Sequence, residues 1–136
     1  MFWKQAAEHL ASQARLSARE IVEHRMRCFR DGDIEGILSD YAEDAILFTP
    51  AGILEGREAI AGLYRRMLQE FREPGASDTV RTAMFEGNYA CIVWSAETSQ
   101  NIYEYASDTF VVRHGKIVMQ SFAAKVISKQ FSQISL

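Results

Sequence analysis

One carboxylate stands out because apolar residues surround it. Asp108 lies within the segment Tyr105–Val112, whose aromatic and β-branched residues predict a strand. If its side chain points into an apolar cavity, these surroundings favour the protonated form, and Asp108 can act as an acid or a base near neutral pH. The alternative is that a nearby cation pairs with Asp108 and only stabilises the sheet. Asp108 is therefore the first candidate catalytic residue.

Arg25 is the second candidate, because it interrupts an apolar helical stripe. Ile21, Val22 and Met26 surround it at helical spacing. Facing a cavity, Arg25 could bind an anionic group of a substrate, or pair with Asp108 and keep that carboxylate ionised. At the edge of the stripe, its stem would pack and its guanidinium would stay in solvent. The sequence leaves these alternatives open.

The remaining reactive side chains lack the partners that metal or nucleophilic chemistry needs. No His or Cys pair has metal-ligand spacing, and no glycine-rich segment resembles a phosphate-binding loop, so we expect no metal and no cofactor. Cys28 lies on an apolar helix and Cys91 in a strand, and neither has a plausible base beside it. His24 falls on a different helical face from Arg25, and His114 precedes Gly115 in a turn.

Composition limits the class of protein. The chain has 136 residues, which predicts one domain. Its net charge of −3 argues against a nucleic-acid partner, because such proteins need a basic excess. No segment approaches the roughly 20 apolar residues that span a bilayer, so we expect no membrane partner. Only two cysteines occur, which favours reduced thiols and a cytoplasmic location.

Three helices are expected in the first half of the chain. A capping box, Ser17 with Glu20, predicts a helix that Gly32 ends. Asp33 can cap a short second helix whose apolar face extends to Tyr41. The third and most regular helix follows Gly56 and stops before residue 74. Strands are expected at 45–49, 53–54, 79–85, 89–98, 102–112 and 116–127.

Helices followed by a curled antiparallel sheet predict an α+β fold. Strand 102–112 carries Ala106, Asp108 and Phe110 on one face, and Tyr103 with Tyr105 on the other. Both faces need cover, and the helices of a chain this short can cover only one. We therefore expect a homodimer through the outer sheet face, and a cone-shaped sheet whose open mouth holds a pocket.

Several phrases of the sequence occur in the order typical of one superfamily. They are Asp31-Gly32-Asp33-Ile34-Glu35-Gly36-Ile37, Tyr41-Ala42-Glu43-Asp44-Ala45, Thr49-Pro50-Ala51-Gly52, Leu54-Glu55-Gly56-Arg57-Glu58-Ala59-Ile60 and Asp108-Thr109-Phe110. The chain thereby resembles the SnoaL-like branch of the nuclear-transport-factor-2-like (NTF2-like) superfamily over residues 18 to 127. The resemblance implies a single domain over 1–136, with a curved antiparallel (mixed) sheet wrapped around N-terminal helices. Residues 1–16 would form a helical extension.

The resemblance implies two kinds of function. The superfamily contains isomerases, cyclases, dehydratases and epoxide hydrolases, and also non-catalytic association modules. Ketosteroid isomerase shares the scaffold, but its base aspartate matches Thr49 here, and its oxyanion-hole tyrosine matches Arg25. Its protonated aspartic acid matches Asp108. A hydroxyl cannot replace a carboxylate as the base, so we do not expect steroid isomerisation by that mechanism.

The candidate site follows from these comparisons. By the resemblance, Trp94, Gln120 and Phe122 point into the cavity, although core packing is the simpler interpretation for each aromatic residue alone. The candidate substrate-binding residues are Phe29, Tyr41, Phe48, Thr49, Tyr64, Trp94, Gln120 and Phe122, and Met67 and Met84 belong to the same apolar pool. We expect a cofactor-free acid–base enzyme for a small cyclic or carbonyl-bearing molecule, or a non-catalytic ligand-binding or dimerisation module.

Overall fold

The first helix begins and ends where its sequence signals lie. The computed structural model describes residues 17–130. Helix α2 (Ala18–Asp31) is capped by Ser17, whose hydroxyl accepts from the Glu20 amide at 3.4 Å. Gly32 ends the helix with a φ of 69°, a left-handed conformation that favours glycine. The face of α2 that carries Ile21 and Val22 is buried against the sheet.

The second helix is shorter than its apolar spacing predicts. Helix α3 (Ile34–Ser39) starts at Asp33, whose carboxylate accepts from the Gly36 amide at 2.9 Å. The spacing extended this helix to Tyr41, and that is corrected here. The chain leaves the helix at Asp40, and Tyr41 opens strand β1 (Tyr41–Thr49), where it pairs with Ile117. Sheet pairing therefore overrides the helical period at this residue.

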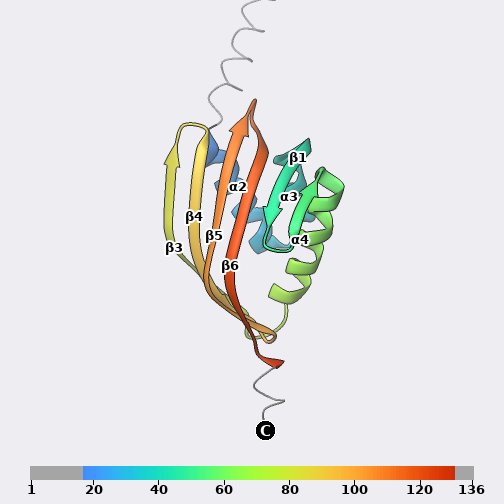
Figure 1. Cartoon of the computed structure of the whole chain (residues 1–136), viewed down its shortest axis with the longest axis vertical. Coiled ribbons are helices and arrows are strands. Elements are labelled where there is room, and N and C mark those ends of the chain that lie inside the picture. The colour runs from blue at the N-terminus through green and yellow to red at the C-terminus, as the bar shows by residue number, and fades with distance from the viewer. Residues whose placement is uncertain (1–16, 131–136) are drawn as a thin grey trace, which may run out of the picture.

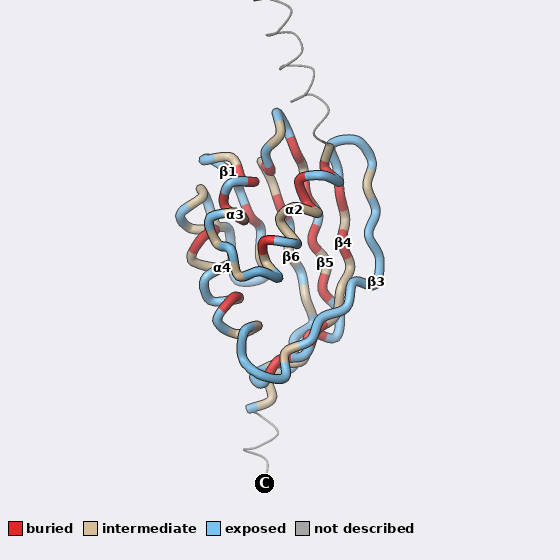
Figure 2. Tube along the Cα trace, turned by 180° about the vertical axis from the view of Figure 1, so that it is seen from behind, coloured by how far each residue is buried: buried red, intermediate tan, exposed pale blue. Residues whose placement is uncertain are grey.

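One mixed sheet contains all six described strands. After β1 come β2 (Gly52–Glu55), helix α4 (Arg57–Phe71), β3 (Ser77–Glu86), β4 (Tyr89–Glu97), β5 (Asn101–Arg113) and β6 (Lys116–Ser128). The strand order is β2-β1-β6-β5-β4-β3. Neighbours are antiparallel except β1 and β6, which run parallel. The sheet curls, and the described helices lie on its inner side (Figures 1 and 2).

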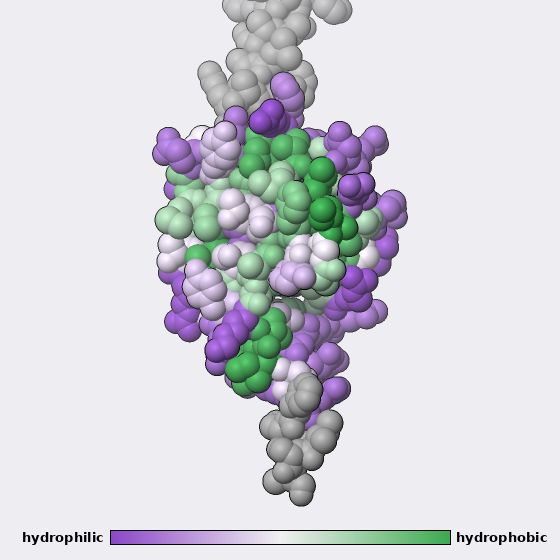
Figure 3. Space-filling view, viewed as in Figure 1, coloured by the Kyte–Doolittle hydropathy of each residue, from purple (hydrophilic) through white to green (hydrophobic). Residues whose placement is uncertain are grey.

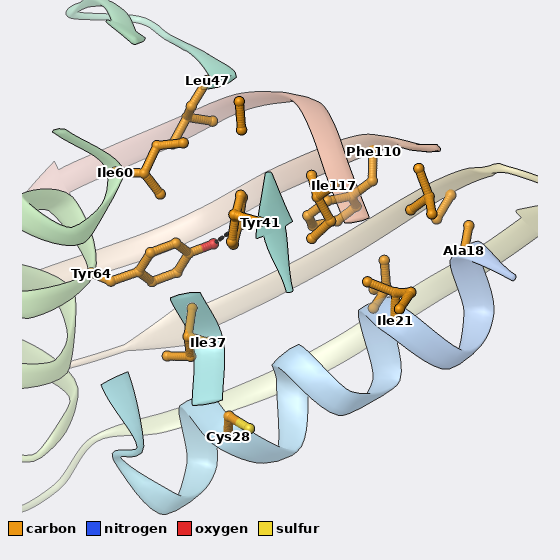
Figure 4. Packing of buried hydrophobic residues seen from close by; sticks show 14 of the residues in the cluster. Ala18, Ile21, Cys28, Ile37, Tyr41, Leu47, Ile60, Tyr64, Phe110 and Ile117 are labelled. Carbon is orange, nitrogen blue, oxygen red and sulfur yellow. Dashed lines mark hydrogen bonds between the residues drawn. The ribbon is translucent and has the colours of Figure 1, made fainter. Parts of the chain in front are cut away.

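The core fills one end of the space between helices and sheet. Side chains from α2, α3, α4 and the inner faces of β1, β5 and β6 meet there (Figure 4). The largest fully buried side chains include Tyr41, Tyr64, Phe110, Ile37 and Leu47. Two of them are tyrosines, whose hydroxyl groups need partners when buried. These tyrosines therefore place hydroxyl groups at the edge of the space between helices and sheet that the core does not fill.

A β-bulge changes the side of Tyr103. The pairing of β5 with its neighbours shifts register between Tyr103 and Tyr105. Strict alternation places the two tyrosines on the same face, but Tyr103 is buried on the inner side and Tyr105 is exposed. The inner face of β5 therefore gains one aromatic ring that alternation does not predict.

No helix within residues 17–130 covers the outer face of the sheet. Register alignment gives one row that crosses all six strands and consists of Met84, Cys91, Thr109, Ser121, Phe48 and Ile53. No member of this row is charged. Met84, Phe48 and Ile53 are 53%, 43% and 59% exposed. Hydrophobic side chains gather on this face in the space-filling view (Figure 3).

Two expectations concern parts of the chain beyond these elements. The helical extension expected at 1–16 lies outside the described residues. None of the helices within residues 17–130 is long and apolar enough to cross a membrane.

Candidate functional site

A cavity of about 120 Å³ lies between helices α2 and α4 and the inner face of the sheet. Helix α2 contributes Arg25 and Phe29, and helix α4 contributes Tyr64. The strands contribute the rest of the predicted lining, namely Trp94, Asp108, Gln120 and Phe122. Met67, from the apolar pool, also lines the cavity. The structure thus brings together both candidate catalytic residues and five of the candidate binding residues.

Aromatic rings form one continuous wall of this cavity. Trp94 stacks on Phe122 with their ring centroids 6.3 Å apart and their planes 20° apart. Phe71 makes an edge contact with Trp94 at 6.3 Å and another with Phe29 at 5.6 Å. Tyr103 does not line this cavity but supports the wall, because it packs on Trp94 and on Phe71 at 5.5 Å from each. A flat apolar ligand would meet rings that already hold one another in place.

Arg25 lines the cavity and is held there by hydrogen bonds to two tyrosine hydroxyl groups. Its Nε–H is shared between the hydroxyl oxygens of Tyr64, at 2.7 Å, and Tyr41, at 3.1 Å. The guanidinium carbon lies 5.0 Å from the ring centre of Phe110 and 5.1 Å from that of Tyr64. The terminal Nη1 and Nη2 groups donate to no side chain or carbonyl within residues 17–130. Arg25 therefore presents several free N–H donors at the cavity.

Asp108 is held at the other end of the same hydrogen-bonded chain. Tyr41 donates to Gln120 Oε1, and Gln120 Nε2 donates to Asp108 Oδ1 at 2.8 Å. Trp94 Nε1 donates to Asp108 Oδ2, also at 2.8 Å. Asp108 is 5% exposed, and the described structure shows no direct ion pair between it and Arg25. Arg25 and Asp108 are therefore connected only indirectly, by hydrogen bonds that run through Tyr41 and Gln120.

The electrostatics of the chain of groups follow from burial and from the neighbouring charges. Burial and the adjacent Tyr64 raise the pKa of Tyr41 well above its ordinary value, although Arg25 opposes this shift. Burial alone would lower the pKa of Arg25, but the nearby Tyr64, Tyr41 and Asp108 raise it above its ordinary value. Tyr41 is therefore a neutral donor and Arg25 a permanent cation at physiological pH.

Four of the residues named from sequence do not line the cavity, and their assignment is corrected here. Phe48 is 43% exposed on the outer row of the sheet, and Met84 lies on the same row. Thr49 closes the β1–β2 turn, where its hydroxyl donates to the Gly52 carbonyl at 2.8 Å. Tyr41 is fully buried behind the cavity and acts on it through Arg25 and Gln120.

Sequence reasoning missed Phe71 in the wall and Tyr103, which packs against it. Phe71 is the last apolar residue of the α4 stripe, so its helical spacing could have placed it on the same face as Tyr64 and Met67. Tyr103 had no such signal, because the bulge in β5 reverses its side. Glu70 was also missed, although it accepts from the Tyr103 hydroxyl at 2.6 Å and fixes that ring. Burial and this bond to Glu70 raise the pKa of Tyr103.

A second group of titratable residues corrects the interpretation of Cys28. Its sulfur lies 3.6 Å from His24 Nε2, so a base does lie beside it. His24 Nδ1 in turn lies 2.6 Å from Asp40 Oδ2. Burial, followed by nearby Asp33 and Asp40, raises the pKa of the thiol, which opposes formation of a thiolate nucleophile. Cys28 is 6% exposed, so its packing role stands.

Metal-ligand geometry is absent from the described part of the chain. Within residues 17–130, no three His, Cys, Asp or Glu side chains are placed to hold a metal ion.

Comparison with solved structures shows the same fold in several proteins. An NTF2-like protein of unknown function from Cytophaga hutchinsonii superimposes with a TM-score of 0.65 at 16% identity, over 88% of this chain and 96% of that one. The epoxide hydrolase/cyclase-like enzyme SalBIII, of pyran ring formation in salinomycin, gives a TM-score of 0.67 at 18% identity, over 79% and 90%. A Kribbella flavida protein provisionally named a ketosteroid isomerase gives 0.66 at 14%, over 79% and 77%.

Sequence comparison identifies the family. No curated protein matches the chain significantly. The family model described as the SnoaL-like domain matches residues 22–120, which include Arg25, Asp108 and Gln120. The match covers most of the chain and agrees with the NTF2-like fold of the structural neighbours. The chain therefore belongs to the SnoaL-like domain family.

Proposed function

We propose that the protein binds a small, mostly apolar molecule that carries a carbonyl or carboxylate oxygen. The observation that carries this proposal is Arg25, a cation with terminal N–H groups that have no partner within residues 17–130. A guanidinium beside an apolar wall interacts strongly with an anionic or polarised oxygen, because little water screens the pair. The rings of Trp94 and Phe122 would contact the apolar part of the ligand.

The test measures binding of benzoate and acetophenone by isothermal titration calorimetry. Both probes have one ring, and they carry a carboxylate and a carbonyl oxygen respectively. Arg25→Gln should weaken benzoate binding about tenfold or more, because it removes a charge-assisted hydrogen bond. Arg25→Lys keeps the charge but loses the planar fork, so it should give an intermediate loss.

Arg30→Gln is the matched control, because Arg30 lies on the same helix at the exposed rim of the cavity. Its benzoate affinity should stay within about twofold of wild type, since an exposed charge contributes little. Absence of binding by both probes to the folded wild-type protein would refute the proposal. Equal losses in Arg25→Gln and Arg30→Gln would refute the role of Arg25.

We propose acid–base catalysis as a second function of the same cavity, because Asp108 lines it and is buried. Asp108 would take a proton from the carbon beside the carbonyl group, and the electron pair of that C–H bond would pass to the carbonyl oxygen near Arg25. Such a step is shared by isomerase- and dehydratase-type reactions, and cyclase- and hydrolase-type reactions would need the acid form of Asp108.

Proton exchange measures this second function directly. In D₂O, the wild-type protein should accelerate deuterium incorporation into the methyl group of acetophenone, followed by NMR. Asp108→Asn should abolish the acceleration while acetophenone still binds. An equal exchange rate with and without wild-type protein would contradict catalysis and leave binding as the function.

We also propose that a second copy of the chain covers the outer sheet face. The uncharged row from Met84 to Ile53 crosses every strand, and Tyr89, Val111, Met119 and Ile46 form much of the next row. Exposed hydrophobic residues concentrated on one face are typical of an interface, and a two-fold axis brings the same face of each copy together. Because Cys28 and Cys91 are both unpaired, we further propose a cytoplasmic location.

A further inference from the structure

A second and larger cavity borders the one that contains Arg25. It measures about 510 Å³ and lies between the C-terminal half of α4 and the adjoining ends of β5 and β6. Leu63, Met67 and Phe122 line both cavities. We call the cavity with Arg25 the inner cavity and the other the outer cavity. The three shared side chains lie where the two cavities meet.

The volumes indicate that the inner cavity does not hold a whole ligand. Its 120 Å³ is close to the volume that holds one benzene molecule, about 150 Å³. Ligand-binding sites in proteins measure roughly 300–1,000 Å³. The outer cavity brings the combined space into this range. A molecule larger than one ring that places its oxygen at Arg25 must therefore extend past the shared side chains.

The outer cavity is built from fixed polar groups and apolar contact surface. Glu70 accepts from Thr98 Oγ1 at 2.8 Å, from Tyr103 at 2.6 Å and from Asn101 Nδ2 at 2.5 Å. These bonds occupy the carboxylate and fix the β4–β5 turn against α4. Gln100 donates to Glu73 at 3.1 Å on the same side. Both carboxylates therefore already have donors. Arg66 and Gln69 add polar groups to the lining, and Leu63, Met67, Phe122 and Val126 supply the apolar surface that a ligand could contact.

Met67 is the side chain best placed to decide how far a ligand extends. It lies one helical turn after Leu63 on α4, and both face Phe122 across the space between the cavities. A methionine side chain has three rotatable bonds and adapts to different shapes, so it can move aside without a change in the backbone. A bulkier, rigid ring at position 67 would close the connection.

We propose that the ligand has two parts, a one-ring head with an oxygen that binds Arg25 and an apolar extension that lies in the outer cavity beyond Met67. This inference rests on the proposed binding function and adds the shape and length of the ligand class. Met67 is then a specificity-determining residue: it decides how much affinity the extension adds to that of the head.

The test compares benzoate with 4-hexylbenzoate, which adds a six-carbon chain to the same head. Wild-type protein should bind 4-hexylbenzoate at least tenfold more tightly, because each buried methylene contributes roughly fourfold in affinity. Met67→Trp should remove this gain, read as the ratio of the two affinities on the same variant, because Met67 lines both cavities and its change can also alter benzoate binding. Calorimetric titration gives both constants on the same protein.

A second pair of variants keeps the test valid if Met67→Trp does not fold. Val126 lines the outer cavity and is 44% exposed, so Val126→Trp fills the outer cavity without disturbing the core. The next residue, Ile127, is 42% exposed and does not line the cavity. Val126→Trp should therefore weaken 4-hexylbenzoate alone, and Ile127→Trp should weaken neither probe.

The outcomes separate this inference from the binding function beneath it. Benzoate binding without any gain for 4-hexylbenzoate would overturn the two-part ligand and leave the role of Arg25 intact. A gain that persists in both Met67→Trp and Val126→Trp would show that the chain leaves by another path, and would also overturn the inference. Failure of wild-type protein to bind either probe would refute the proposed function itself.

Discussion

The amide group of Gln120 has only one orientation that satisfies its neighbours. Its oxygen accepts from Tyr41, and its nitrogen donates to Asp108. Tyr41 has then used its only proton, so Tyr64 must donate to Tyr41 while accepting from Arg25. Each donor direction is fixed by the next group along the chain. A change at one residue therefore leaves an unpaired group at another.

Asp108→Asn tests this coupling through stability. The amide nitrogen of asparagine would replace an oxygen that accepts from Trp94 or Gln120, which leaves two donors facing each other. We expect the free energy of unfolding to fall by about 1–3 kcal/mol, measured by urea denaturation. Asp44→Asn, at an exposed position of β1, is the control and should change it by less than about 0.5 kcal/mol. Equal stability of the two variants would contradict the coupling.

At the scale of single residues, the sequence predicted side chains on regular elements well. Arg25 and Asp108 were candidates because of their places in an apolar helical stripe and a strand, the resemblance gave Trp94, and all three line the cavity. Phe48 does not line it, because whether a strand residue points in or out depends on the parity of its position. Thr49 does not line it either, because it lies at the β1–β2 turn. A sequence shows that alternation but not which face receives the helices.

At the scale of helices and strands, two glycines in different helices allow a matched pair of substitutions. Gly36, in α3, packs so closely that an added Cβ would lie 2.6 Å from Cys28 Sγ and even closer to the capping carboxylate of Asp33. In α4, a Cβ on Gly62 would meet only Arg66 Nη1, at 3.7 Å. Gly62→Ala should raise the free energy of unfolding by about 0.5–1 kcal/mol, because alanine favours helices. Gly36→Ala should lower it. Stabilisation by both substitutions would contradict the close packing of α3 on α2.

Asp40, at the end of α3, predicts a specific dependence of stability on pH. Burial raises its pKa above 3.8, although the facing His24, Lys116 and Arg25 oppose the shift. The folded state then binds the proton more readily than the unfolded state. The contribution of Asp40 to the free energy of unfolding therefore increases as the pH falls through the raised pKa, and the increase is complete below about pH 3.8.

The measurement compares wild type with Asp40→Asn by urea denaturation from pH 7 to pH 3. The difference in free energy of unfolding, wild type minus variant, should grow more positive as the pH falls. Asp44→Asn again provides the control, and its difference from wild type should stay nearly constant by comparison. A difference for Asp40→Asn that becomes more negative on acidification would show that the pair with His24 outweighs burial.

Element boundaries were predicted where a local signal defines them. Ser17, Gly32 and Asp33 bound helices as their capping patterns indicated. The end of α3 and the side of Tyr103 were not predicted, because each depends on pairing with a strand that lies far along the sequence. Local patterns carry no information about such partners.

At the scale of the whole molecule, the outer sheet face predicts the assembly state. Wild-type protein at tens of micromolar should have the mass of two chains by light scattering. Thr109→Glu places a charge in the middle of the uncharged row, and should give the mass of one chain. Gln69→Glu adds the same charge on α4 and should leave the mass unchanged. A single-chain mass for the wild-type protein would contradict the proposed interface.

The α+β class and the order of elements were predictable, because the helical and strand periods succeed one another clearly along the chain. The parallel pairing of β1 with β6 was not visible in any local pattern. Nor was the division of the interior into two cavities, which depends on where Leu63, Met67 and Phe122 meet in space. Both features arise from contacts between distant segments.

The pairing of the earliest strand with the latest one has a consequence for synthesis on the ribosome. Tyr41 has its register partner, Ile117, and its acceptor, Gln120, in β6, so it must wait until both have left the exit tunnel. Until then the nascent chain exposes an unpaired strand edge and an incomplete interior. Truncations that remove Ile117–Ser121 should therefore yield insoluble polypeptide instead of a shortened but folded protein.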